Sequence, residues 1–159
     1  MRQCKNARAV SLSGLCETAL AAGVMTALAT SAAPAASVKE TLEKYKLLGT
    51  FSYDCSKPAD KRNNYFVSRP IDADHVQRDL MSGPTTRDWI SVIDKAEEVH
   101  AYEVKVHSTR NGESVESVWL IEPGRMLQWQ AATNGKATIQ NGEFLSTRYR
   151  MPWLNRCGD

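Results

Sequence analysis

Residues 102–121 read YEVKVHSTRNGESVESVWLI, and this stretch decides the fold. Two runs of alternating apolar and polar residues flank Asn111-Gly112, a pair that accepts positive φ at both central positions of a two-residue hairpin turn. The register that follows pairs Arg110 with Glu113, Val104 with Trp119, and Tyr102 with Ile121. One face of this hairpin is then apolar and aromatic, and the other carries much of the charge. That agreement supports the register, because a slip of one residue would exchange the faces.

Similar runs, separated by turn residues, extend in both directions. Turn signals stand at Ser82-Gly83-Pro84, Pro123-Gly124, Asn134-Gly135 and Asn141-Gly142. The strands expected between them span residues 50–55, 64–69, 75–81, 88–94, 99–109, 113–121, 125–133 and 136–140. The pattern predicts an all-β domain, an antiparallel meander of about eight strands that forms a small closed or nearly closed barrel. Ahead of it, Ser37 and Glu40 form a capping box that predicts one short helix over about 38–47.

A second two-residue turn at Pro123-Gly124 would pair Ile121 with Met126 and Trp119 with Gln128, although a type II turn fits hairpin twist poorly. A turn at Asn134-Gly135 would then place Gln130 beside Ile139. The inner face predicted to bind a ligand comprises Tyr102, Val104, Trp119, Met126, Gln128 and Gln130. Ligand sites are commonly apolar with a few placed polar groups. The alternative is a packed core in which the two amides bond to neighbouring side chains or buried water.

The outer face of the same strands is not fully polar. Val118 would pair with Trp129 and Leu120 with Leu127. Such a patch needs a cover. The N-terminal helix, the C-terminal segment or a second molecule could supply it, so an oligomer is one expectation.

The first 35 residues have the pattern of a secretory signal peptide. Arg2, Lys5 and Arg8 precede an apolar run over 18–29, and Ala33-Pro34-Ala35 fits a cleavage site. The alternative is a retained membrane anchor, which would need about 20 strongly apolar residues. We expect one domain over 36–159, periplasmic or secreted. No later stretch is apolar enough to span a membrane.

Cys55 and Cys157 are the only cysteines after that segment. In an exported chain they are expected to form a disulfide, the alternative being free or intermolecular thiols. The remaining chain keeps 17 of the 20 basic and 17 of the 18 acidic residues, a net charge of zero. This balance does not favour a nucleic-acid partner, which would normally need a clustered basic face.

Recognisable motifs for catalysis, phosphate binding or dinucleotide binding do not occur. Asp72, Asp74 and His75 form the densest polar cluster, but alternation puts His75 on the other side from the carboxylates. We therefore expect no enzyme, no metal site and no cofactor, although a Ser-His-Asp triad can assemble from distant residues.

The order of features resembles the opening of lipocalin-like (calycin) barrels: a short helix, then Leu48-Gly49-Thr50-Phe51, then an antiparallel meander. In lipocalins a G-x-W motif on the first strand closes the barrel, with an arginine from a late strand over the indole. Here Phe51 replaces the tryptophan, and Arg148 or Arg150 would supply the arginine. The layout is also similar to small exported proteins of unassigned function from Gram-negative bacteria, with Asp54-Cys55-Ser56 near the first strand.

The lipocalin resemblance implies a small barrel that binds apolar ligands. We therefore expect a periplasmic protein that binds an apolar small molecule with a polar end. The alternative is a protein-binding module, such as an inhibitor of an envelope or secreted hydrolase. A hollow interior would favour the first function, and a filled barrel with an exposed loop would favour the second.

Overall fold

The computed structural model describes residues 35–158, so the expected signal segment lies outside the described residues apart from Ala35. The helix α1 (Val38–Lys44) begins at the predicted capping box. Ser37 Oγ accepts the Glu40 N–H at 3.2 Å, and Glu40 Oε2 accepts the Ser37 N–H at 2.9 Å. The Glu40 carboxylate accepts from the Ser37 N–H and also from the Ser37 hydroxyl, and these two bonds hold the pKa of Glu40 below its usual range. The helix ends three residues earlier than expected.

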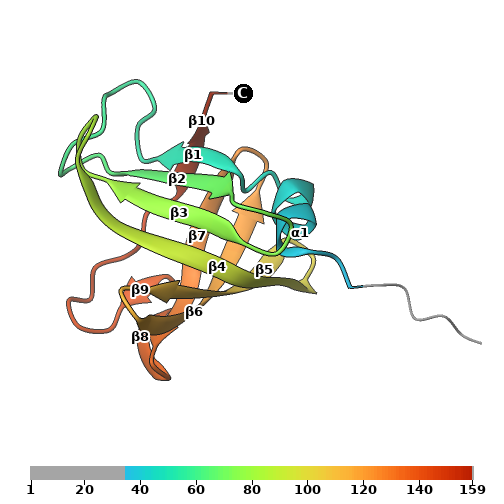
Figure 1. Cartoon of the computed structure of the whole chain (residues 1–159). Helices are drawn as coiled ribbons and strands as arrows, with labels where there is room; N and C mark the ends of the chain where they lie inside the picture. Colours follow the sequence, from blue (N-terminus) through green and yellow to red (C-terminus); the bar gives the residue numbers. More distant parts are fainter. Residues whose placement is uncertain (1–34, 159) are drawn as a thin grey trace, which may run out of the picture. The chain divides into compact units, whose positions relative to one another are not determined.

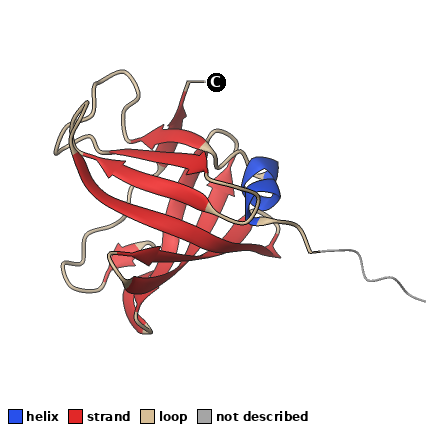
Figure 2. Cartoon of the chain, in the orientation of Figure 1, coloured by secondary structure: helices blue, strands red, loops and turns tan. Residues whose placement is uncertain are grey.

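Within the described residues, ten strands follow the helix, and Figure 2 shows them in red, joined by loops drawn in tan. Their bounds are β1 (Gly49–Ser52), β2 (Tyr65–Pro70), β3 (Val76–Met81), β4 (Arg87–His100), β5 (Glu103–Arg110), β6 (Glu113–Glu122), β7 (Arg125–Thr133), β8 (Lys136–Gln140), β9 (Glu143–Phe144) and β10 (Leu154–Cys157).

Eight of these strands close into an antiparallel barrel. Strands β1 to β7 pair in sequence order, and β10 closes the ring by pairing with both β1 and β7 (Figure 1). One edge of β7 is shared, because Met126 pairs with β10 whereas Ala131 pairs with β8. The hairpin of β8 and β9 therefore extends beyond the closed ring. The predicted eight-stranded meander is confirmed, with β10 in place of the β8 that the sequence suggested.

The Asn111-Gly112 hairpin has the predicted register throughout, including Val104 opposite Trp119. Asn111 and Gly112 have φ values of 52° and 81°, as a two-residue hairpin turn of this kind requires. At Pro123-Gly124 the expected pairs of Ile121 with Met126 and Trp119 with Gln128 also form.

Three details of the expected strands were wrong, and a register shift accounts for each. Strand β4 continues to His100 instead of ending at residue 94. Register shifts after Ile93 and Glu98 interrupt its alternation, so the sequence pattern did not show this continuity. Another shift, between Val118 and Trp119, brings Gln130 opposite Val118 instead of Trp129. In the β7–β8 pairing, a separate shift between Ala131 and Ala132 brings Ile139 opposite Ala131 instead of Gln130.

The apolar core fills the end of the barrel next to α1. Leu42 and Leu47 enter it from the helix and the segment that follows, and Phe51, Ile93 and Val104 enter it from strands. Phe51 lies opposite Arg156 in the β1–β10 ladder, and the Arg156 guanidinium donates to the Lys46 carbonyl oxygen at 3.0 Å. The late-strand arginine beside Phe51 is thus Arg156.

Arg148 and Arg150, the arginines expected at that position, are exposed. They precede β10, and Arg148 pairs with Glu143 at 2.8 Å.

The turn between β8 and β9, backed by the segment before β10, covers the Trp129 and Leu127 part of the expected outer apolar patch. The Gly142 N–H donates to the Trp129 carbonyl oxygen at 2.8 Å, and the Met151 N–H donates to the Gly142 carbonyl oxygen at 2.7 Å. Gly142 has a φ of 70°, and a Cβ there would lie 3.7 Å from Leu127. Val118 and Leu120, the other members of the expected patch, are half-buried and line outer clefts.

A disulfide joins Cys55 to Cys157, as expected. It links the loop after β1 to the end of β10 across a sequence separation of 102 residues. Such bonds persist in oxidising compartments, which favours a protein that works outside the reducing cytoplasm.

Candidate ligand-binding cavity

The barrel is hollow at the end away from α1. A cavity of about 830 Å³ opens there, within the range of about 300–1,000 Å³ that small-molecule sites occupy. Residues from the β1–β2 loop, from β2 to β9 and from the segment before β10 line it. They are Tyr53, Asn64, Phe66, Leu80, Trp89, Arg110, Val115, Gln128, Ala131, Thr133, Lys136, Ala137, Thr138, Ile139, Phe144, Leu145, Ser146, Tyr149 and Met151.

Aromatic and aliphatic side chains form most of this lining. Phe66 on β2 and Trp89 on β4 both pair with Leu80 on the strand between them. Their rings contact edge to face, with centroids 6.2 Å apart. Across the cavity, Ile139 comes from β8 and Leu145 from the segment after β9. The hairpin beyond the closed ring therefore contributes a wall, and the cavity can hold an apolar molecule.

The charges on the lining are all positive. Arg110 lies over the Trp89 ring at 5.4 Å from the ring centroid, and Lys136 stands at the start of β8. The lining residues include no aspartate or glutamate.

Arg78 lies directly beneath the floor of the cavity. Like Val76 and Leu80, two residues before and after it on β3, Arg78 points into the barrel, and only 6% of it is exposed. Its guanidinium lies 5.0 Å from the Phe66 ring centroid and 4.5 Å from that of Trp119. Phe66 belongs both to the cavity lining and to this ring pair, so one side chain separates the guanidinium from the cavity.

Among the described residues, Arg78 has no anionic partner. Within residues 35–158, no ion pair includes it. Its two terminal nitrogens each lie 3.8 Å from Met126 Sδ, a weak acceptor. The neighbouring carboxylate, Asp79, is also buried but pairs with Arg69 and Arg87. Burial lowers the pKa of Arg78 to about 10, so the group stays charged at neutral pH.

Polar side chains stand on the strands at either side of Arg78. Ser68 and Ser91 flank it on the two neighbouring strands, and both are buried. Ser91 Oγ donates to the Arg78 carbonyl oxygen at 3.4 Å, whereas Ser68 Oγ is buried with no hydrogen-bond partner in the described part of the chain. Gln128, on the floor, donates to Ser117 Oγ at 2.8 Å. This layer is suited to a polar group at the base of the cavity.

The predicted ligand-binding residues occupy three different places. Val104, Trp119 and Met126 are buried in the filled half of the barrel, and Gln128 lines the cavity. Two placements on the inner face were wrong. Tyr102, in the turn between β4 and β5, has a φ of 67° and is 65% exposed. Gln130 lies on the outer face because of the bulge in β7.

Sequence reasoning missed Arg78, although a signal was present. In the run from Val76 to Leu80 the apolar residues alternate, and Arg78 occupies the same phase as both of them. A charged residue in the inward phase of a barrel strand is a candidate for function, because buried charges are costly unless they are paired.

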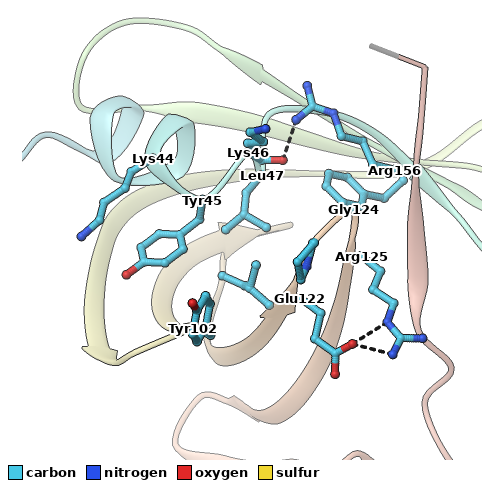
Figure 3. Close-up of a pocket in the computed structure, with 12 residues that line it drawn as sticks. Lys44, Tyr45, Lys46, Leu47, Tyr102, Glu122, Gly124, Arg125 and Arg156 are labelled. Carbon is cyan, nitrogen blue, oxygen red and sulfur yellow. Dashed lines mark hydrogen bonds and ion pairs between the residues drawn. The ribbon is translucent and has the colours of Figure 1, made fainter.

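A second, smaller cleft lies at the α1 end, with a volume of about 300 Å³ (Figure 3). Its polar groups are already engaged: Arg156 donates to the Lys46 carbonyl oxygen, and Arg125 pairs with Glu122 at 2.5 Å. Tyr45 and Tyr102 both line this cleft. With a smaller volume and satisfied charges, it is a weaker ligand site than the open end.

A Ser-His-Asp row occurs on the outer face. Asp94, the bulged residue of β4, places Oδ1 2.5 Å from His107 Nδ1, and Ser114 Oγ lies 2.9 Å from His107 Nε2. Acyl transfer would also need donors for an oxyanion. The Ser114 N–H is already donated to Asn134 Oδ1 at 3.0 Å. The N–H of the candidate nucleophile is therefore not free to act as an oxyanion donor.

Comparison with known protein families, curated proteins and solved structures gave no match. The fold is compatible with calycin-like barrels through its eight closed antiparallel strands alone. Over residues 35–158, no group of three or more His, Cys, Asp or Glu could hold a metal ion. No helix in that range has the length and apolar character to cross a membrane.

Proposed function

We propose that this protein binds an apolar small molecule with a polar end in the open half of its barrel. The observation that carries the proposal is the cavity of about 830 Å³, lined mainly by aromatic and aliphatic side chains. The polar layer around Gln128 and Arg78 beneath it supports a ligand whose polar end points inward.

The lining sets the scale of the expected affinity. Each buried methylene is worth about 0.8 kcal/mol, so a chain of about ten carbons supplies roughly 8 kcal/mol before the costs of association. That sum makes a Kd of about 1 μM the tightest that such a chain alone would give. Because the costs of association make the actual Kd weaker than this limit, titrations should extend to about 0.5 mM probe where its solubility allows.

The proposed location is the periplasm or the extracellular medium, after removal of residues 1–35. The disulfide supports it. Mass spectrometry of the exported fraction should find a chain that begins near Ala36. Intact Met1–Asp159 in the cytoplasm would contradict this location.

Ligand binding is tested first by native mass spectrometry of protein purified from its own envelope. Displacement of the uncharged fluorophore N-phenyl-1-naphthylamine by chain-length series of alcohols and acids should then saturate. The matched variants are Thr133→Trp, which obstructs the cavity, and Ala132→Trp, the next residue along β7, on the outer cleft.

Only Thr133→Trp should weaken binding, provided that both variants fold. The proposal fails if nothing copurifies and no probe saturates. It also fails if the two variants bind the fluorophore equally well.

The alternative function is a protein-binding module, and one observation favours it. Tyr102 is an aromatic side chain held largely in solvent by a turn with positive φ, next to a cleft lined by Trp153. Crosslinking in the envelope from position 102 would test this function. A specific crosslinked partner, lost on Tyr102→Ala, would favour the module over the carrier.

A further inference from the structure

We propose that the polar end of the ligand is an anion, a carboxylate, and that Arg78 is the residue that selects it. This inference rests on the proposed function, because it needs a ligand in the cavity. It names the charge class of that ligand, which the cavity's volume and apolar lining leave open.

The first argument is the uncompensated charge. Arginines are almost never fully buried unless they are paired, because the loss of hydration is not repaid. Arg78 is buried against Phe66, Trp119 and a thioether sulfur, and in residues 35–158 it has no carboxylate partner. Cation–π contacts compensate only part of that loss. An anion from outside the chain would complete the site.

The second argument is the sign of the cavity. Arg110 and Lys136 line it, Arg78 lies beneath it, and no acidic residue is on the lining. Low-dielectric walls that carry one sign of charge concentrate the field and raise the local concentration of the opposite charge. An anion is therefore favoured over a neutral or cationic ligand from the rim to the floor.

The third argument is the chemistry at the floor. A guanidinium presents donors in a planar fork that matches a carboxylate in a bidentate manner. Ser68 Oγ, beside Arg78 on β2, is buried and has no hydrogen-bond partner in the part of the chain that the structure describes, so its hydroxyl can donate to the same carboxylate. One buried positive charge is balanced by one negative charge, which favours a carboxylate over a doubly charged phosphate.

The route to Arg78 passes Phe66. This ring lines the cavity on one side and contacts the guanidinium on the other. A rotation of the Phe66 side chain would bring the carboxylate against the guanidinium, while Leu80, Trp89 and Ile139 hold the alkyl chain. The polar end then lies at the floor and the apolar end toward the rim.

The test compares dodecanoate with dodecanol, two probes with the same chain length and different charge. Both are titrated against N-phenyl-1-naphthylamine at pH 7.5 below their micelle or solubility limits. The wild-type protein should bind dodecanoate at least tenfold more tightly. Arg78→Met, which keeps an unbranched apolar stem without the charged guanidinium, should bind both probes equally. The control Lys105→Met removes one positive charge from the outer face of β5 and should retain the tenfold preference.

The outcomes separate this inference from the proposed function. If neither probe binds the wild-type protein, the proposed function fails. If both bind equally to the wild-type protein, or if Arg78→Met keeps the preference, the ligand-binding function stands and the role of Arg78 is refuted. Should Arg78→Met fail to fold, the wild-type comparison, repeated with methyl dodecanoate as a second uncharged probe, still decides the charge class.

Discussion

Arg78→Met should stabilise the ligand-free protein. Burial lowers the pKa of Arg78 to about 10, whereas an ordinary arginine titrates above about 12. At about 1.36 kcal/mol per pKa unit, the buried charge costs the folded state roughly 3 kcal/mol. A lowered pKa in a basic group penalises the charged form, so this cost is fully present at pH 7, begins to fall as the pH rises past about 10, and is lost only above the ordinary arginine pKa.

Methionine would recover only part of that cost. The guanidinium's contacts with the Phe66 and Trp119 rings are lost, each worth about 0.5–1 kcal/mol. The methionine stem keeps most of the packing, and its sulfur can contact the same rings. We therefore expect a net gain of about 1–2 kcal/mol in the free energy of unfolding.

The assay is equilibrium unfolding in urea, followed by far-UV circular dichroism. Urea is used because the chloride of guanidinium chloride is an anion that could screen or bind Arg78. Circular dichroism is used because the substitution lies beside Trp119 and would itself change the tryptophan fluorescence. Lys105→Met serves as the control and should change stability by less than about 0.5 kcal/mol. A loss of more than about 1 kcal/mol in Arg78→Met would refute the reasoning, since it would mean that the fold itself compensates the charge.

Three further predictions concern the barrel and its surface. Replacing Cys55 and Cys157 by serine should cost about 2–5 kcal/mol in the free energy of unfolding, because the bridge closes a loop of about 100 residues; equal melting temperatures with and without reductant would contradict this. Trp119→Ala should cost about 3–5 kcal/mol, as large deletions in cores do, and a loss below about 1 kcal/mol in urea unfolding would mean that Trp119 is not a core residue. Ser114 should not react with a fluorophosphonate probe, because its N–H is engaged by Asn134; a covalent adduct at Ser114 in peptide mapping would show that the row with His107 is catalytic.

The features predicted correctly from the sequence obey local or covalent rules. Asn111-Gly112 fixes a turn type, and the turn fixes the register of both flanking strands. Ser37 and Glu40 satisfy the first N–H groups of α1 within four residues. The disulfide followed from there being only two cysteines beyond the expected signal segment. None of these features needs knowledge of the far side of the barrel.

The features that the sequence did not predict depend on tertiary pairing. Strand β10 is only four residues long and forms because β1 and β7 both offer it an edge. The bulge in β7 turns Gln130 outward, and a bulge leaves no period that alternation can detect. The cavity escaped prediction because its volume depends on how strands tilt and where the β8–β9 hairpin lies.

Arg78 shows how a candidate site residue can be overlooked. Its phase on β3 was readable from Val76 and Leu80, but its lack of a partner was not, because that depends on every neighbouring strand. Asp79, the next residue, could have been taken for its counter-ion. It faces the other side of the sheet and pairs with Arg69.

The most direct test of the central claim is NMR mapping of dodecanoate on the ¹⁵N-labelled protein. The bound probe should shift the side-chain amide of Gln128, the indole N–H of Trp89 and the Nε–H of Arg78, all at or beneath the open cavity. Signals of Tyr45 and Tyr102, at the α1 end, should stay in place. Shifts confined to the α1 end, or no saturable shift at all, would contradict a ligand site in the open half of the barrel.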